Sequence, residues 1–152
     1  MKALPSAGLR QYVAMTAAGQ LFGIPVPAVR DVLGPLRLTR VPLAPPEVAG
    51  NLNLRGRIVT AIDLRPRLGL APRAKDAAWM SVVVEHQGEL YSLIVDSVGE
   101  VLSLDTAACE RELPTLDPRW REFTDGIYRL NGALLVVLDV AHLLTFTKAE
   151  AA

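Results

Sequence analysis

The chain has 152 residues, of which 51% are hydrophobic, and this content supports a buried core and argues against a disordered chain. Lysine plus arginine and aspartate plus glutamate both number 16, and this balance argues against a nucleic-acid binder that works by neutralising phosphates. No apolar run approaches the roughly 20 residues of a membrane span, and the one cysteine, Cys109, excludes an internal disulfide. We therefore expect a cytoplasmic protein that does not insert directly into a membrane.

Short apolar runs rich in β-branched residues predict a mainly β chain. Turns at Gly19, Gly88 and Gly132 separate several of these runs, and the first two turns indicate β-hairpins. Many short strands with regular turns favour barrels or a sandwich over alternating strands and helices. The strands are expected at residues 12–15, 21–26, 58–64, 81–85, 90–95 and 134–140.

The second of these runs contains two prolines, Pro25 and Pro27. Proline has no backbone N–H and cannot donate to a β-ladder. The strand must therefore lie at an edge of its sheet or be interrupted at this point.

Two short helices are also expected. Residues 46–49 begin with proline and are followed by Gly50, the usual residues for the start and the stop of a helix. Residues 117–123 repeat this design, with Asp117 as the candidate N-cap.

The chain contains an internal repeat. Residues 21–33 align without a gap with residues 90–102, and residues 54–64 align with residues 130–140. Two copies of one pattern in a chain of this length imply two small, similar units.

The alignment also sets approximate boundaries for the two repeats. We expect residues 11–70 and 77–146 to form two five-stranded barrels that pack on one another, with strands able to cross between them. Residues 71–76 form a short polar linker between the copies.

Asp63 and Asp139 occupy equivalent positions in the two copies. Two aspartates brought together can share a proton and support acid–base chemistry, so an enzyme is one interpretation. Neither residue lies in the Asp-Thr/Ser-Gly turn of aspartic proteases. In the simpler interpretation each aspartate ends a strand and caps the following turn. The enzyme interpretation requires the two side chains to meet in a shared cleft.

The other reactive side chains give no further support to catalysis. His86 and His142 lack a second histidine or cysteine at the spacing of metal ligands. Cys109 has no nearby histidine or cationic cluster to favour a thiolate, so a structural role is expected. No glycine-rich phosphate loop is present. We therefore expect no metal and no cofactor, and these residues leave the enzyme interpretation open without adding support to it.

A difference between the copies indicates where a partner could bind. Arg55 of the first copy aligns with Asn131 of the second, so only the first copy has a guanidinium just before its turn glycine. Asp31 is the nearest acidic candidate to pair with Arg55. Such a pair could orient the guanidinium and present the adjacent backbone to a partner. It could equally be an ordinary surface salt bridge worth about 0–1 kcal/mol.

Residues 50–65, with the sequence GNLNLRGRIVTAIDLR, resemble the signature segment of the CheW coupling proteins of bacterial chemotaxis. The resemblance continues through residues 22–24, 29–32 and 95–102, and extends over residues 11–146. It implies a single CheW-like domain made of two SH3-like five-stranded β-barrels.

The resemblance also implies a non-catalytic adaptor. CheW-like proteins join the cytoplasmic tips of methyl-accepting chemoreceptors to the regulatory domain of the CheA-type histidine kinase. They pack with other CheW-like domains into arrays near the membrane, without binding nucleic acid. The alternative is a CheW-like component of another sensory or twitching-motility pathway that binds only one of these partners.

By position in this sequence, the resemblance assigns residues to two surfaces. Those expected to bind the kinase are Asp31, Leu54, Arg55 and Gly56. Those expected to bind a receptor are Val29, Val98 and Val101. Val98 and Val101 are expected to face a groove between the barrels, and Val29 matches a position implicated in coupling.

Overall fold

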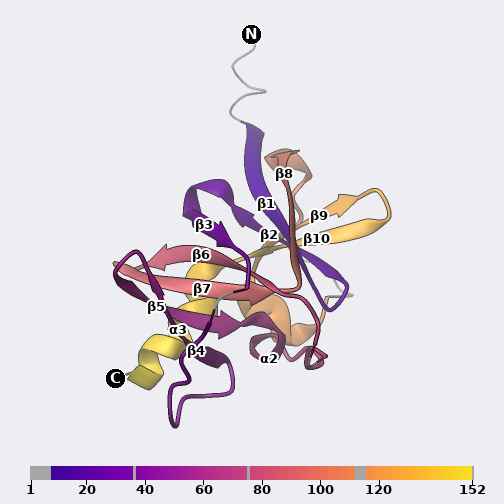
Figure 1. Ribbon diagram of the computed structural model, residues 1–152. Coiled ribbons are helices and arrows are strands. Elements are labelled where there is room, and N and C mark those ends of the chain that lie inside the picture. The colour runs from indigo at the N-terminus through magenta and orange to yellow at the C-terminus, as the bar shows by residue number, and fades with distance from the viewer. Residues whose placement is uncertain (1–7, 36, 75, 112–115, 152) are drawn as a thin grey trace.

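The computed structural model describes residues 8–35, 37–74, 76–111 and 116–151, and the side chains of its last helix as far as Thr145 (Figure 1). The strands are β1 (Leu9–Ala17), β2 (Gln20–Pro25), β3 (Val29–Leu33), β4 (Val48–Leu54), β5 (Arg57–Asp63), β6 (Met80–His86), β7 (Glu89–Val95), β8 (Ser97–Asp105), β9 (Thr124–Leu130) and β10 (Ala133–Leu138). The helices are η1 (Val26–Ala28), α2 (Leu64–Arg67), η2 (Thr106–Ala108), η3 (Pro118–Phe123) and α3 (Val140–Ala151).

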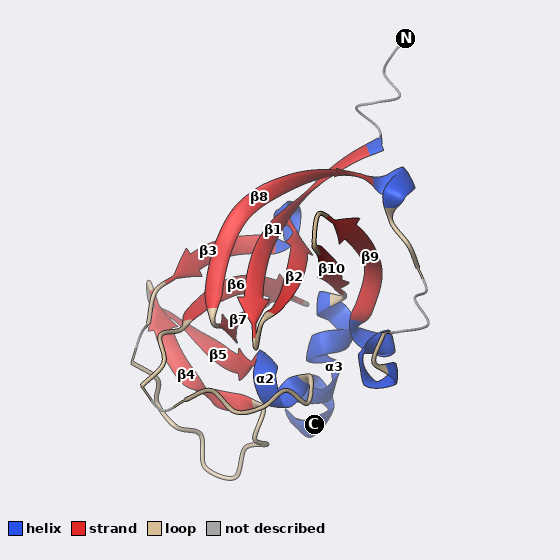
Figure 2. Cartoon of the chain, turned by 90° about the vertical axis from the view of Figure 1, so that its right-hand side faces the viewer, coloured by secondary structure: helices blue, strands red, loops and turns tan. Residues whose placement is uncertain are grey.

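These strands form two five-stranded sheets (Figure 2). Sheet A has the order β8-β1-β2-β10-β9, and sheet B has the order β3-β6-β7-β5-β4. The prediction of a mainly β fold built from two five-stranded units with few short helices is confirmed.

The two sheets do not coincide with the two sequence repeats. The hairpin that opens the first repeat, β1–β2, pairs through β2 with β10 of the second repeat. The hairpin that opens the second repeat, β6–β7, pairs through β7 with β5 of the first. Both of these exchanged pairings are parallel. The ranges 11–70 and 77–146 therefore delimit repeats of the sequence, and each sheet takes strands from both.

Each sheet curls around a small core of its own. Buried residues of sheet A contact side chains from both of its edge strands, and those of sheet B do the same, so we call the two units barrel A and barrel B. The barrel A core contains Tyr12, Leu102, Leu104, Tyr128, Leu135 and Val137. The barrel B core contains Leu33, Leu52, Val59, Ala61 and Ile94.

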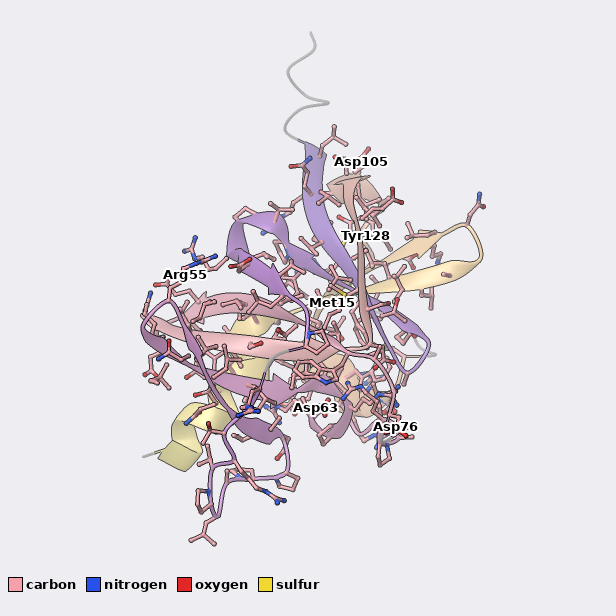
Figure 3. The ribbon with its side chains drawn as sticks, viewed as in Figure 1. Met15, Arg55, Asp63, Asp76, Asp105 and Tyr128 are labelled. Carbon is pink, nitrogen blue, oxygen red and sulfur yellow. The ribbon has the colours of Figure 1, made fainter. Side chains whose placement is uncertain are left out.

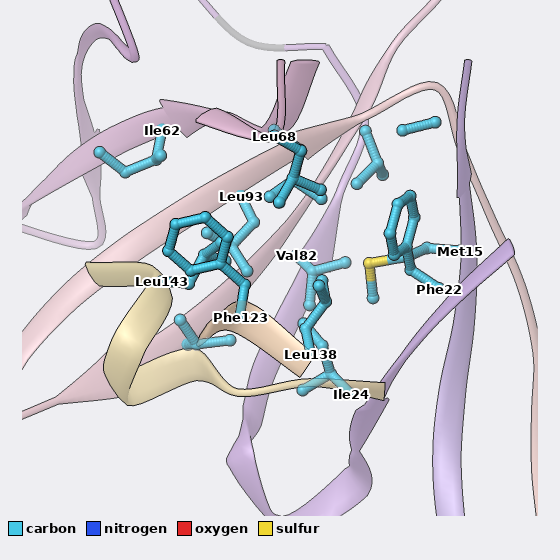
Figure 4. Close-up of a cluster of buried hydrophobic side chains, with 14 of the residues drawn as sticks. Met15, Phe22, Ile24, Ile62, Leu68, Val82, Leu93, Phe123, Leu138 and Leu143 are labelled. Carbon is cyan, nitrogen blue, oxygen red and sulfur yellow. The ribbon is translucent and has the colours of Figure 1, made fainter. Parts of the chain in front are cut away.

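A third and larger core lies between the barrels, and we call it the central core (Figure 4). It includes Met15 and Phe22 from barrel A, Val82 and Leu93 from barrel B, and Leu143 from α3. Many strands therefore bury both faces, one in their own barrel and one in the central core. This explains the nearly continuous apolar runs of the sequence, because alternation disappears when both faces are buried.

The helix predicted at residues 46–49 is wrong, because the chain turns at residues 46–47 and β4 begins at Val48. Gly50 is not a helix stop. A Cβ atom built on Gly50 would lie 2.7 Å from the carbonyl oxygen of Thr39, which forms a bridge with Asn51. A close backbone approach is the other common reason for a glycine, and here it is the reason that applies.

The other local predictions agree with the structure. The segment after Asp117 is the 3-10 helix η3, and the Asp117 side chain accepts a hydrogen bond from the backbone N–H of Arg119 at 2.9 Å. Strand β2 ends at Pro25 and gives way to η1, so the prolines interrupt the strand as expected. The predicted strand at residues 134–140 ends at Leu138, and α3 follows.

Candidate interaction surface

Arg55 and Gly56 form the two-residue turn between β4 and β5. Their φ angles are +52° and +86°, so both adopt the left-handed conformation that a tight type I′ hairpin turn requires. The backbone N–H of Gly56 donates to the side-chain oxygen of Asn53 at 2.9 Å, which fixes the turn. The Arg55 side chain is 77% exposed. The turn therefore presents a guanidinium to solvent on a rigid backbone.

Asp31 holds this guanidinium in place. Nη2 of Arg55 lies 3.2 Å from Oδ2 of Asp31, and Oδ1 of Asp31 accepts from the backbone N–H of Val32 at 2.8 Å. Asp31 lies in β3 and Arg55 follows β4, and these are the two edge strands of sheet B. The predicted ion pair is thus confirmed, and it joins the two edges of barrel B. Figure 3 shows Arg55 at the end of barrel B that carries the turn between β4 and β5.

A pocket of about 210 Å³ lies beside the ion pair. Its charged rim includes Arg30 and Glu85, which form a second ion pair at 3.1 Å. Its apolar lining comes from Leu54, Val83 and Leu90. Asp31, Leu54 and Arg55 all line this pocket, so the structure brings together three of the four residues expected to bind the kinase, and Gly56 follows directly in the turn.

The equivalent turn of the second repeat differs. It consists of Asn131 and Gly132 between β9 and β10, with no guanidinium at its tip. The nearby Arg129 forms an ion pair with Glu110, with Nε of Arg129 lying 2.6 Å from Oε2 of Glu110. The two copies thus share a scaffold and differ in the chemistry of this turn.

Val98 and Val101 lie on the same face of β8 because of a β-bulge. Val98 pairs with Met15 and Val101 pairs with Val13, so three steps on β8 correspond to two steps on β1. Without the extra residue the two valines would lie on opposite faces of the strand. They share instead the face on which Val13 and Met15 join the central core.

Exposure differs among the three residues expected to bind a receptor. Val98 of barrel A and Val29 of barrel B are both half-buried against the central core. Val101 is 54% exposed, because β8 is an edge strand that pairs only with β1. The valines from the two barrels therefore border the same core, and Val101 extends this apolar border into solvent.

The two aspartates of the enzyme interpretation have separate partners. Asp63 accepts from the backbone N–H of Arg65 at 3.1 Å and caps α2. Asp139 accepts from the backbone N–H of His142 at 3.2 Å, at the start of α3, and its Oδ2 lies 2.7 Å from Nδ1 of the same histidine. The capping prediction is confirmed for both. Their interactions tie them to different helices, so the structure gives no support to a shared carboxylate site.

Cys109 packs against the barrel A core, beside the buried Tyr12–Tyr128 pair. The two hydroxyl oxygens lie 3.1 Å apart, and burial, together with the hydrogen bond to Tyr12, raises the pKa of Tyr128 above its ordinary value. Over the described part of the chain, no group of three histidine, cysteine, aspartate or glutamate side chains is placed to hold a metal ion. No helix in the same residues is long and apolar enough to cross a membrane.

Sequence reasoning missed a cluster of two arginines and two aspartates near the contact between the barrels, formed by Asp63, Arg65, Arg73 and Asp96. The four side chains are only 12–26% exposed. Burial alone would raise the pKa of the Asp96 carboxyl, but the hydrogen bonds from Arg65 and from the Ala18 backbone outweigh it and hold that pKa below its ordinary value. The one available signal was that Asp96 aligns with Pro27 in the first copy, a mismatch at a strand end.

Comparison with known protein families matches residues 11–148 to the CheW-like domain. The chain belongs to the CheW-like family. A "Probable chemotaxis protein CheW" from Rhizobium etli is 27% identical to this CheW-like protein over 95% of the chain and 94% of the relative. The "Protein PilI" of Pseudomonas aeruginosa is 32% identical over 78% of the chain and 66% of the relative.

A solved structure agrees with this assignment. The scaffolding protein TtCheW from Thermoanaerobacter tengcongensis superposes on this CheW-like protein with a TM-score of 0.80 and 29% identity, covering 89% of this chain and 87% of the other. The family resemblance expected from residues 50–65 is therefore confirmed by sequence and by fold.

Proposed function

We propose that this CheW-like protein is a non-catalytic chemotaxis adaptor that couples the cytoplasmic tips of chemoreceptors to the regulatory domain of a CheA-type histidine kinase. It would work in the cytoplasm, recruited to membrane-associated receptor arrays, and could also pack against other CheW-like domains. Relatives named as chemotaxis or scaffolding proteins match this chain over nearly their whole length. This similarity supports the proposal.

The observation that carries the kinase half of the proposal is the oriented guanidinium at the Arg55 turn. Asp31 supplies an anionic partner, but the Arg55 side chain remains 77% exposed. A surface pair of this kind adds about 0–1 kcal/mol to folding, so the fold has little need of it. An ordered, exposed arginine beside a pocket with an apolar lining is the type of residue that dominates protein–protein binding energy. Asp31, Leu54, Arg55 and Gly56 would therefore form the kinase-binding surface.

The receptor half of the proposal rests on the apolar border between the barrels. An amphipathic helix docks by laying its apolar face into a hydrophobic groove. Val29 and Val98 come from different barrels and pack on the same core, with Val101 exposed beyond them. We infer that the tip of a chemoreceptor, which is helical, docks along Val29, Val98 and Val101.

The kinase surface is tested by calorimetric titration of the protein with the regulatory domain of its cognate CheA-type kinase. We expect Arg55→Ala to weaken binding about 10- to 100-fold, because truncating an arginine hot spot costs about 1–3 kcal/mol of binding energy. Arg129→Ala is the matched control, since it removes an exposed, carboxylate-paired arginine near the equivalent turn of the other repeat. Unchanged affinity in a folded Arg55→Ala protein, or equal losses in both variants, would contradict the proposed surface.

The similarity to Protein PilI supports a second candidate, a CheW-like component of another sensory or twitching-motility pathway that binds only one of the two partners. Titration of the same preparation with a receptor tip fragment separates the candidates. Binding of both the kinase domain and the receptor tip supports the coupling adaptor. Binding of only one partner supports the alternative.

A further inference from the structure

The chain passes from one barrel to the other at Asp96, the single residue between β7 of barrel B and β8 of barrel A. Its backbone N–H donates to the carbonyl of Thr16 at 2.9 Å, and its Oδ2 accepts from the backbone N–H of Ala18 at 2.8 Å. Both partners belong to the β1–β2 hairpin of barrel A. The crossing residue is therefore fixed on the barrel A side by its backbone and by its side chain.

The same carboxylate is held from barrel B by two guanidinium groups. Nη2 of Arg65 lies 2.7 Å from Oδ2 of Asp96, and Nε of Arg65 lies 3.2 Å from Oδ1. Nε of Arg73 also lies 3.2 Å from Oδ1 of Asp96. Arg65 is part of α2, and Arg73 lies on the connection between β5 and β6. One side chain thus receives hydrogen bonds from three separate segments of the protein.

The two arginines are themselves anchored within barrel B. The Arg73 guanidinium reaches Asp63, with Nη1 lying 3.3 Å from Oδ2. Nη1 of Arg65 donates to the carbonyl of Ala71 at 2.7 Å. The cluster therefore continues from the crossing residue to the end of β5, and it also holds the connection that carries Arg73.

Burial and directionality give this cluster a role that the central core cannot supply. Packing of apolar side chains is non-directional and tolerates some repacking. Ion pairs with the guanidinium fork have one preferred geometry, and at 12–26% exposure these are less screened by salt than pairs on the surface. Buried ionic groups can specify one arrangement even where they add little net stability.

We propose that Asp63, Arg65, Arg73 and Asp96 form an ionic latch that fixes the orientation of barrel A relative to barrel B. Strand β5 begins beside the Arg55 turn and ends at Asp63, while β8, with Val98 and Val101, begins directly after Asp96. The latch therefore joins the end of β5 that lies opposite the Arg55 turn to the start of β8, next to Val98. The four latch residues would act as positioning residues without contacting either partner. Only this last consequence rests on the proposed function.

The orientation is measured without any partner, by the distance between two nitroxide labels. Glu89→Cys places a label at the exposed start of β7 in barrel B, beside the β6–β7 turn. Asn131→Cys places one on the exposed β9–β10 turn of barrel A. Both are made in a Cys109→Ser background. Arg73→Ala and Arg65→Lys are introduced separately. Each keeps both carboxylates, and Arg65→Lys also keeps the charge while removing the guanidinium fork. Arg30→Ala, which breaks the exposed Arg30–Glu85 pair inside barrel B, is the matched control.

We expect one narrow distance distribution in the parent protein and in Arg30→Ala. Each latch variant should give a broadened distribution or a shifted maximum, while near-ultraviolet circular dichroism shows that both barrels remain folded. A loss of stability alone would not move the distance, so this readout separates orientation from simple stabilisation. An unchanged narrow distribution in folded Arg73→Ala and Arg65→Lys proteins would overturn the latch.

The functional consequence is tested separately. We expect folded Arg73→Ala protein to bind the isolated kinase domain as the parent does, but to form less of the ternary complex with kinase domain and receptor tip. Ternary complex equal to that of the parent would remove this consequence and leave the distance result standing. If the parent protein binds neither partner, the proposed function fails, whatever the label distances show.

Discussion

At the first crossing between the barrels, β2 ends at Pro25 and the chain reaches β3 through η1. At the second crossing, Asp96 alone separates β7 from β8. The two crossings are equivalent in the repeat, with Pro27 aligned with Asp96. The first is restricted locally by proline rings, which fix φ without a side-chain partner. The second is fixed by charged groups from distant segments. The chain thus crosses between the barrels twice, and the crossing is fixed once by backbone stiffness and once by long-range ionic contacts.

The largest expected difference between the crossings concerns folding stability. Asp96→Ala leaves two partly buried arginines without their shared carboxylate. Removing one member of a fully buried pair costs about 3–5 kcal/mol, and the partial exposure here reduces the expected loss to about 2–3 kcal/mol. Chemical denaturation measures this loss as a lower midpoint with an unchanged slope. A loss below that of an exposed pair, about 1 kcal/mol, would show that the second crossing needs no ionic support.

The second expected difference is in sensitivity to acid. The pKa of Asp96 is held below its ordinary value, so the folded state prefers the ionised carboxyl. Its stabilising effect is fully present above the unfolded-state pKa of about 3.9, and is lost as the pH falls from there through the lower folded-state pKa. We expect the free energy of unfolding of the parent protein to fall more steeply below about pH 4 than that of Asp96→Asn. Parallel pH profiles for the two proteins would contradict the ionic account.

The smallest expected difference comes from the first crossing. Pro27→Ala should destabilise the protein by about 0.4–1 kcal/mol, because it gives the unfolded chain more conformations to lose on folding. The effect should be independent of pH and of salt, since no charge is involved. Denaturation of this variant at low and high ionic strength checks both statements. A salt-dependent loss would show that the two crossings are coupled.

The features that the sequence predicts well are local. The hairpin turns, the caps at Asp63, Asp117 and Asp139, and the end of β2 at its prolines depend on residues within a few positions of one another. The Arg55–Asp31 pair could also be predicted, because the mismatch with Asn131 singled out Arg55 and few acids lie nearby in the same unit.

The features that were missed are those decided at long range. The alignment of the repeats reveals two similar units, but it does not say which copy supplies the neighbouring strand in each sheet. In the sequence Gly50 indicates a helix stop, and only the structure shows that its role is to allow the close approach of the Thr39 backbone. The contacts of Asp96 come from Ala18, Arg65 and Arg73, which are 78, 31 and 23 positions away. No local pattern encodes such partners.

The exchange of strands has a consequence for the order in which the two sheets can be completed during synthesis. Barrel B is contiguous, running from Val29 to Val95, so all of its strands are available as soon as β7 has left the ribosome. Barrel A is interrupted, because β2 must wait for β10, which begins at Ala133. Long-range pairing of this kind slows folding, because the entropy of closing a large loop is lost before the stabilising contacts form. The first hairpin to be synthesised therefore belongs to the last sheet to be completed, and its exposed edge needs protection until the end of translation.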